Sequence, residues 1–340
     1  MGRTDARASK RGAARLSPAH NLLEQPMRDT CSHTYRPILN LHLFRRMRCS
    51  PMRAFSRCLH TTPEFKIGTN PIELLQKLHR RGLVKDNSAG FSDHLLRKRT
   101  VYAGFDPTAE TLHIGSLSLL ATMCMFAKHG HEVIALIGGA TALVGDPSGR
   151  STGRKQLSIQ QVEDNSKGIA EVIQRVVGRY SSSVRIVNNA DWMSKISLLD
   201  FLRSTGNHFR VDSAFASVFA WKQFRDLQVG ALLSRDSVKN RMTSGDGLSF
   251  TEMSYQLMQA HDFAFLHKEF GCTVQLGGAD QWGNIVGGIE LVRKVHNAEV
   301  HALTIPLILN SSGEKLGKSA GNAVWLRQDM TSLYSFRSVV

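Results

Sequence analysis

The chain of 340 residues is long enough for one large α/β domain with extensions, or for two modest domains. Hydrophobic residues make up 42% and charged residues 21%, and no run of 18 apolar residues occurs, so no membrane-spanning helix is expected. The formal net charge of +15 suggests an anionic partner such as a nucleic acid. That charge is concentrated in residues 1–60, which hold twelve Lys and Arg against three acidic residues, so the remaining chain is only mildly basic.

The N-terminal stretch is rich in Arg and poor in acidic residues, and its apolar segment 38–44 is followed by Arg45, Arg46 and Arg48. A basic segment of this kind is typical of a mitochondrial transit peptide, whereas a secretory signal would have a longer apolar centre. We therefore expect residues 1–62 to be a transit peptide or disordered extension, and the chain to reach the mitochondrial matrix. A basic tail or an incorrectly assigned exon is the alternative interpretation.

Three of the five cysteines fall in this extension, which leaves Cys124 and Cys272 in the body of the chain. Neither has a second Cys or His at ligand spacing, so neither a zinc site nor a disulfide framework is expected. We predict no metal that is bound by protein side chains alone.

Hydrophobic periodicity predicts helices and strands from about residue 65 onward. The expected helices cover 71–83, 114–128, 159–177 and the region around 255–262, and the expected strands cover 100–105, 132–137, 184–187 and 302–309. Strands that alternate with helices predict an α/β fold, with a Rossmann-like, mostly parallel sheet and helices on both faces. Ligands bind beyond the carboxyl ends of the strands in such sheets.

Small and turn-forming residues join the strand 100–105 to the following helix, in the sequences YAGFDPT at 102–108 and LHIGS at 112–116. Glycine allows a ligand to approach the backbone closely, and the start of the helix presents N–H groups suited to a phosphate. His113 lies where its side chain can donate to a phosphate oxygen. A His-Ile-Gly sequence alone is a weak signal, but within GFDPTAETLHIG it becomes a strong one.

Two further loops combine glycine with charged residues. The first is GGATALVGDPSGR at 138–150, a glycine-rich loop that any α/β protein can contain. The second is QLGGADQWGN at 275–284, in which adjacent glycines follow a strand. We expect close backbone contact with a nucleoside at the second loop, with Asp280 accepting hydrogen bonds from ribose hydroxyls.

Tyr255, Gln259 and Asp262 are spaced four and three residues apart on a predicted helix, so they share one face. Such a face is either exposed to solvent or forms the polar floor of a pocket. A lysine-rich sequence, KLGKS at 315–319, follows the last expected strand. Loops of this composition are usually solvated turns.

Taken in order, these motifs resemble those of the tyrosyl-tRNA synthetases, a family of class I aminoacyl-tRNA synthetases, over roughly residues 65–334. The segment around His113 resembles their HIGH signature, and KLGKS resembles their KMSKS loop. The resemblance implies a class I catalytic domain over residues 63–334.

The resemblance also implies the roles of individual residues. The implied tyrosine-binding residues are Tyr102, Asp146, Tyr255, Gln259, Asp262 and Gln281, of which Tyr102 and Asp262 would hydrogen-bond the phenol hydroxyl. The implied ATP-binding residues are Gly104, Asp106, Thr108, Gly115, Gly278, Asp280 and Ser319. The implied catalytic residues are His113, Ser116, Arg150, Arg154, Lys315 and Lys318.

The implied reaction begins with attack of the tyrosine carboxylate on the α-phosphorus of ATP, which gives tyrosyl-adenylate and pyrophosphate, and ends with transfer to tRNA(Tyr). A carboxylate is already ionised, so catalysis depends on positioning and on stabilising the charge of the phosphates. Magnesium would be carried on the ATP phosphates. The resemblance further implies a homodimer that has no part inserted in a membrane.

Three features depart from the family pattern. Ser116 replaces the final His of the HIGH signature, for which we expect a slower activation step and not its loss. Residues 212–229 form an apolar insert, which is either genuine or an artefact of the gene sequence. The chain ends soon after the lysine-rich loop, where the family continues, so the anticodon-binding and RNA-binding domains are expected to be absent.

The main alternative is a catalytically impaired, truncated synthetase that acts as an RNA-binding or regulatory protein, which would fold without binding tyrosine. A tryptophanyl synthetase shares the fold and the lysine-rich loop, but Tyr102 and Asp262 both suit a phenol hydroxyl. A dinucleotide-binding oxidoreductase is disfavoured, because no GxGxxG with an acidic residue about 20 positions later occurs.

Overall fold

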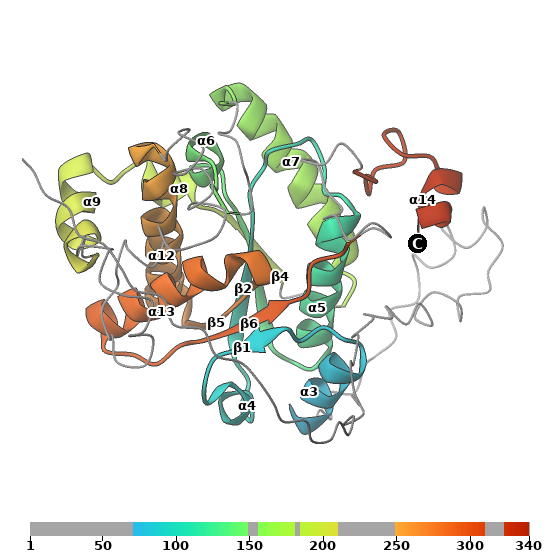
Figure 1. Cartoon of the computed structure of the whole chain (residues 1–340), viewed down its shortest axis with the longest axis horizontal. Coiled ribbons are helices and arrows are strands. Elements are labelled where there is room, and N and C mark those ends of the chain that lie inside the picture. Colours follow the sequence, from blue (N-terminus) through green and yellow to red (C-terminus); the bar gives the residue numbers. More distant parts are fainter. Residues whose placement is uncertain (1–70, 149–155, 181–183, 210–248, 310–322, 340) are drawn as a thin grey trace, which may run out of the picture. The chain divides into compact units, whose positions relative to one another are not determined.

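The computed structural model of the chain describes residues 71–148, 156–180, 184–209, 249–309 and 323–339. Within these residues, six strands form one sheet in the order β1-β6-β5-β2-β3-β4. The strands are β1 (Asp86–Asn87), β2 (Thr100–Phe105), β3 (Glu132–Ile137), β4 (Val184–Asn188), β5 (Cys272–Gly278) and β6 (His301–Ile305). Only β1 pairs antiparallel among these strands, with β6, which confirms the predicted mostly parallel sheet (Figure 1).

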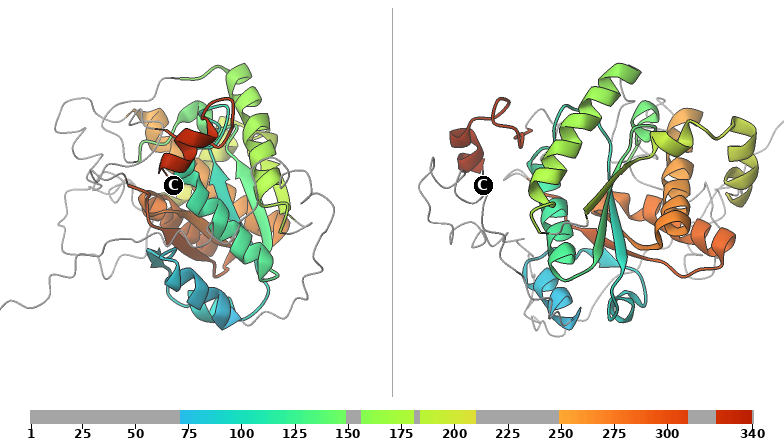
Figure 2. Two further views of the ribbon diagram at one scale, coloured as in Figure 1. Left: turned by 90° about the vertical axis from the view of Figure 1, so that its right-hand side faces the viewer. Right: turned by 180° about the vertical axis from the view of Figure 1, so that it is seen from behind.

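Helices cover both faces of the sheet, as predicted (Figure 2). One face carries α5 (Leu117–Lys128) and α7 (Ile159–Val176), which contact the strands β2, β3 and β4. The opposite face carries α12 (Phe250–Phe270) and α13 (Trp282–His296), which contact β5 and β6. The remaining helices are short, namely α3 (Pro71–Arg80), α4 (Phe91–His94), α6 (Thr141–Val144), α8 (Ala190–Met193), α9 (Leu198–Ser204) and α14 (Leu333–Val339).

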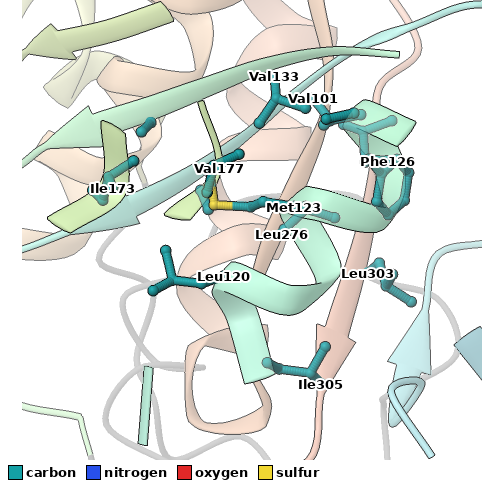
Figure 3. Packing of buried hydrophobic residues seen from close by; sticks show 14 of the residues in the cluster. Val101, Leu120, Met123, Phe126, Val133, Ile173, Val177, Leu276, Leu303 and Ile305 are labelled. Atoms are coloured by element: carbon teal, nitrogen blue, oxygen red, sulfur yellow. The ribbon is translucent and has the colours of Figure 1, made fainter. Parts of the chain in front are cut away.

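The two faces have separate cores because successive side chains of a strand point to opposite faces. In β2, Val101, Ala103 and Phe105 join the core beneath α5 and α7, whereas Tyr102 joins the core beneath α12. Figure 3 shows the first core, in which residues of α5 pack between strands and α7. Its labelled members are Val101, Leu120, Met123, Phe126, Val133, Ile173, Val177, Leu276, Leu303 and Ile305.

Local sequence signals explain where two elements end. The helix predicted over 71–83 ends earlier because Gly82 adopts a left-handed conformation with φ 63°. The N–H of Gly82 donates to His79 O and that of Leu83 to Leu78 O, both at 2.9 Å, which is the Schellman arrangement. The strand predicted over 302–309 was too long: β6 ends at Ile305 because Pro306 has no N–H to donate to a neighbouring strand.

The other predicted elements are confirmed with small shifts. The strands predicted over 100–105 and 132–137 agree with β2 and β3, and the strand predicted over 184–187 extends by one residue. Ser158 starts α7 with a capping box, in which its Oγ accepts from Gln161 N and its own N–H donates to Gln161 Oε1. No helix in the described part of the chain is long and apolar enough to cross a membrane.

Candidate active site

The carboxyl ends of the parallel strands meet at one edge of the sheet. The chain passes from β2 outward to β3 and β4, then returns on the other side of β2 with β5 and β6. The direction of the strand order therefore changes between β2 and β5, and open α/β sheets bind ligands at such a point. The sequence motifs around residues 104–116, 138–148 and 275–284 all lie at this edge.

Asp262 of α12 is held by two donors in the core of the sheet's α12 face. Its side chain is 1% exposed. Trp192 Nε1 donates to Asp262 Oδ1 and Asn189 Nδ2 donates to Asp262 Oδ2, each at 2.9 Å. Burial raises the pKa of Asp262 to about 7, against the opposing effect of these two hydrogen bonds. The two hydrogen bonds hold the carboxyl group in a fixed orientation.

Asp106 is held in a similar way at the end of β2. Tyr255 of α12 donates its hydroxyl to Asp106 Oδ2 at 2.9 Å, and Thr141 Oγ1 donates to Asp106 Oδ1 at 2.8 Å. Asn189 Nδ2 also donates to Thr141 Oγ1, at 3.1 Å. Because Asn189 contacts Asp262 as well, the two carboxylates belong to one buried polar network that joins β2, α6, α8 and α12. Of its members, sequence analysis identified Asp106, Tyr255 and Asp262.

Asn189, Thr141 and Trp192 were missed, although one signal pointed to the first. Asn188 ends the strand β4 and Asn189 follows it, and the carboxyl end of a parallel strand is where site residues gather. Asn188 Oδ1 accepts from Gly139 N at 3.2 Å, and Asn189 Oδ1 accepts from Ala140 N at 2.7 Å. These two amides therefore fix the loop after β3 as well as Asp262.

Tyr102 presents a buried hydroxyl that has no hydrogen-bond partner in the structure. The side chain is 1% exposed, and its ring lies 5.2 Å from that of Phe263. Burial raises the pKa of the Tyr102 hydroxyl, and its electrostatic interactions with Cys272 and Asp262 raise it further, so Asp262 lies within electrostatic reach. A buried polar group left unpaired costs about 1–3 kcal/mol, so this hydroxyl is suited to pairing with a ligand.

Among the described residues, three glutamine amide oxygens are also buried and unpaired, those of Gln256, Gln259 and Gln275. Gln259 Oε1 of α12 and Gln275 Oε1 of β5 are buried and have no hydrogen-bond partner. Gln275 is the register partner of Tyr102, so both side chains point to the α12 face from neighbouring strands. Sequence analysis named Gln259 but missed Gln275, whose position beside Tyr102 becomes visible only once the register is known.

Asp146, which follows α6, and Gln281, which follows β5, are hydrogen-bonded to each other. Gln281 Nε2 donates to Asp146 Oδ2 at 2.7 Å, and the N–H of Ser148 donates to Asp146 Oδ1 at 2.9 Å. Asn284 Nδ2 donates to Gln281 Oε1 at 3.1 Å, which fixes the amide of Gln281 from α13. The structure thus brings together two residues that sequence analysis assigned to one substrate.

The glycines at the strand ends serve two different purposes. A Cβ on Gly104 would meet no atom within 4 Å, so this residue leaves open space above β2. A Cβ on Gly138 would instead overlap Asp106 Oδ1 and Thr141 Oγ1, so glycine there permits the polar network to form. A Cβ on Gly278 would lie 2.6 Å from Asp280 Oδ1, which shows that Asp280 folds back over the end of β5.

His113 precedes a short 3₁₀ helix, Ile114–Ser116, that leads into α5. His113 Nδ1 accepts from the N–H of Gly115 at 3.0 Å, which leaves Nε2 as the ring nitrogen that carries the hydrogen. The side chain of Ser116 makes no capping bond, so it does not satisfy the N–H groups at the start of α5. The first N–H groups of this turn are already paired within it: Gly115 N donates to His113 Nδ1, Ser116 N to His113 O and Leu117 N to Ile114 O.

The turn that leads to His113 is supported by α7. The N–H of Thr108 donates to Asp106 O at 2.8 Å, and Asn165 Nδ2 of α7 donates to Pro107 O at 3.0 Å. Gly168 of α7 makes room for the carbonyl of Glu110, since a Cβ there would overlap that oxygen. The helix therefore fixes the predicted ATP-binding residues Asp106 and Thr108 from the opposite face.

The remaining predicted residues lie outside the described part of the chain: Arg150, Arg154, Lys315, Lys318 and Ser319. The described residues on either side of the lysine-rich loop still locate its two ends. The loop follows β6, and the N–H of Ile114 donates to Val324 O at 2.8 Å beyond it. One end thus starts from the carboxyl side of the sheet and the other returns to the His113 segment.

Comparison with known proteins identifies the family. The family model described as tRNA synthetases class I (W and Y) matches residues 95–338. The chain is 44% identical over 272 residues to a tyrosine–tRNA ligase of Aeromonas hydrophila, covering 78% of this chain and 60% of the relative. It is 43% identical over 250 residues to the mitochondrial tyrosine–tRNA ligase of Mus musculus, covering 70% of this chain and 49% of the relative.

A solved structure shows the same fold. The C-terminally truncated mitochondrial tyrosyl-tRNA synthetase of Aspergillus nidulans matches with a TM-score of 0.62 and 32% identity, over 78% of this chain and 74% of the other. The chain spans about half to three fifths of the length of the curated relatives given above. It belongs to the class I tRNA synthetases of the W and Y family, and its relatives within that family are tyrosyl enzymes.

Proposed function

We propose that the chain activates tyrosine with ATP, which gives tyrosyl-adenylate and pyrophosphate, and that the tyrosyl group is transferred to tRNA(Tyr). One observation carries this proposal: the unpaired, buried hydroxyl of Tyr102 lies within electrostatic reach of the Asp262 carboxylate. A phenol hydroxyl between these groups can donate to one and accept from the other. Phenylalanine would leave the Tyr102 hydroxyl unpaired, and tryptophan has no hydroxyl to offer.

Other polar groups on the α12 side and at the carboxyl edge of the sheet suit the rest of the amino acid. Gln259 Oε1 and the Asp146 carboxylate are acceptors for the substrate's ammonium group, and Tyr255 is oriented by its bond to Asp106. The Gln281 amide lies beside Asp146, where it borders the carboxylate that reacts. We add Gln275 to this set as a residue that contacts the aromatic ring or its hydroxyl, because its amide oxygen is also buried and unpaired.

ATP enters as its magnesium complex, and the metal is part of this substrate. The open space above Gly104 and the glycines at the end of β5 let the nucleotide approach the backbone, with Asp280 accepting from the ribose. His113, Arg150, Arg154, Lys315 and Lys318 would stabilise the charge that develops on the phosphates. No side chain needs to act as nucleophile or base, since the tyrosine carboxylate is itself the nucleophile.

The test is tyrosine-dependent exchange of pyrophosphate into ATP by the 340-residue chain, with phenylalanine and tryptophan as controls. We expect exchange with tyrosine alone, and its loss in Lys318→Ala. This half-reaction does not need tRNA, so it separates activation from charging. A folded sample that shows no exchange with tyrosine contradicts the proposal.

We also propose that residues 1–62 direct the chain to the mitochondrial matrix and that residues 63–334 form its catalytic unit. The basic composition of the first segment and the mitochondrial names of the mouse and Aspergillus relatives support this location. Residues 1–62 fused to a fluorescent protein should carry it into the matrix. A cytosolic signal from that fusion contradicts the proposal.

A further inference from the structure

The segment that follows the lysine-rich loop is paired with the backbone around His113. The N–H of Ile114 donates to Val324 O at 2.8 Å, and the N–H of Leu326 donates to Leu112 O at 2.9 Å. These two bonds flank an antiparallel bridge between His113 and Trp325. The side chains of a bridged pair point to the same side, so the two rings must be neighbours.

An ion pair between Arg327 and Glu110 joins the same two segments. Arg327 donates through its terminal nitrogen to Glu110 Oε2 at 2.9 Å and through Nε to Asp329 Oδ1 at 2.8 Å. These groups are largely exposed, so the ion pair adds little free energy by itself. The backbone bonds are the main anchor, and Arg327 aligns the segment that follows Trp325.

The indole of Trp325 packs against the imidazole of His113. The ring centroids are 6.0 Å apart and the planes meet at 71°, an edge-to-face arrangement within the range that aromatic pairs favour. The bond from Gly115 N fixes one ring nitrogen of His113. A hydrogen bond at one ring nitrogen does not by itself fix the plane of the ring. The indole edge packs against the imidazole and therefore helps to determine where Nε2 points.

We propose that Trp325 is a positioning residue, which holds the His113 imidazole in the orientation required to contact the phosphates of ATP. The inference depends on the proposed function, because it assigns Trp325 a role in the same reaction. It also explains why a large aromatic side chain follows the lysine-rich loop at the one position that bridges His113. Trp325 acts through His113 and need not touch the substrate.

The test is a double-mutant cycle in pyrophosphate exchange, with Trp325→Leu and His113→Ala made singly and together. We expect Trp325→Leu to lower kcat/KM for ATP by about 3- to 10-fold, the range that an edge-to-face contact represents. In the His113→Ala background the same change should have an effect below about twofold, because no imidazole remains to be positioned. Equal effects in both backgrounds overturn the inference and leave Trp325 with a structural role only.

Two further variants distinguish the aromatic contact of Trp325 with His113 from the ion pair of Arg327, which aligns the following segment. Trp325→Phe keeps an aromatic edge and should recover most of the activity that Trp325→Leu loses. Arg327→Gln removes the ion pair and should leave kcat/KM within about twofold of the original value. If Trp325→Phe is as impaired as Trp325→Leu although its thermal midpoint is unchanged, the edge-to-face contact is not what matters, and the inference is wrong.

A readout that is independent of activity distinguishes failure of this inference from failure of the proposed function. The imidazole resonance of His113 can be assigned by NMR from its absence in His113→Ala. We expect Trp325→Leu to move this resonance, because a neighbouring ring is removed. An unchanged resonance overturns the inference. A moved resonance in a chain that catalyses no exchange supports the positioning contact and contradicts the proposed function instead.

Discussion

The two faces of the sheet are built from the same strands but have different cores. Beneath α5 and α7, the core consists of apolar side chains such as Leu120, Phe126 and Ile173, each fully or almost fully buried. Beneath α12, the core also includes the buried carboxyl of Asp262 and the unpaired hydroxyl of Tyr102. The first core is a cluster of apolar side chains, whereas the second cluster is joined by a buried carboxyl and an unpaired hydroxyl. A parallel sheet can keep its stabilising core and its recognition site apart simply through the alternation of side chains.

The largest effect is expected from Asp262→Asn on the α12 face. The amide would place an NH₂ group against one of the donors Asn189 and Trp192, which leaves buried groups mispaired at about 1–3 kcal/mol each. We therefore expect kcat/KM for tyrosine in pyrophosphate exchange to fall by about 100-fold or more. Trp192→Phe removes a single donor and should lose less. Unchanged tyrosine kinetics in Asp262→Asn contradict the assignment of this pocket.

Leu120→Ala tests the opposite face. Leu120 is fully buried in the first core, and such truncations remove about 2–5 kcal/mol from the free energy of unfolding. We expect a loss of this size in urea denaturation, while KM for tyrosine stays within about twofold of the original value. A comparable rise in KM would show that the two faces are not independent.

Gly138 and Gly104 form a matched pair at the ends of neighbouring strands. Gly138→Ala forces its Cβ onto Asp106 and Thr141, so we expect it to destabilise the protein by about 1–3 kcal/mol. Gly104→Ala meets no neighbour and should change stability by less than about 0.5 kcal/mol. If the open space is a binding site, Gly104→Ala instead raises KM for ATP or tyrosine. Thermal unfolding and exchange kinetics of both variants separate these outcomes.

The smallest expected effect is a loss of stability in acid, which arises at His131. Burial lowers the pKa of His131 to about 4 from 6.5, and the nearby His129 adds to the shift. The unfolded chain therefore binds more protons between these values, so the stability is present above pH 6.5 and falls as the pH drops toward 4. We expect a loss on the order of 1–2 kcal/mol over this window.

The matched variant for this prediction is His131→Asn, which keeps an acceptor for the N–H of Arg99. Its free energy of unfolding should vary less between pH 6.5 and 4 than that of the original chain. His94 contributes to the same trend, since burial lowers its pKa to about 4 as well. An unaltered pH profile in His131→Asn would assign the acid sensitivity to other groups.

Sequence analysis was most successful where the signal is local. Hydrophobic alternation and length identified β2 and β3 at their observed bounds, and the spacing of Tyr255, Gln259 and Asp262 identified one polar face of α12. The strand β6 was predicted too long because apolar residues continue beyond Pro306, and the pattern of hydrophobicity outweighed the missing N–H.

The residues that were missed act through contacts distant in sequence. Trp192 lies on the short helix α8 and reaches Asp262 with its indole N–H, and no periodicity indicates such a pair. Gln275 becomes a candidate only when the register places it beside Tyr102. Trp325 follows the lysine-rich sequence 315–319, but its contact with His113 joins two segments that are far apart in the sequence. These relations arise from topology, which single-sequence patterns do not specify.

The pairing of β2 with β5 also limits the order in which the strand pairs of the sheet can form during synthesis. During synthesis, β3 can pair with β2, and β4 with β3, soon after they emerge. The other edge of β2 pairs with β5, which begins at Cys272 and is synthesised much later. Until then β2 is an exposed edge strand, whose unpaired N–H and C=O groups are a template for pairing with another chain. Contacts so distant in sequence also form slowly. The nascent chain is therefore open to aggregation along the strand that later lies inside the sheet, until β5 has been synthesised and pairs with it.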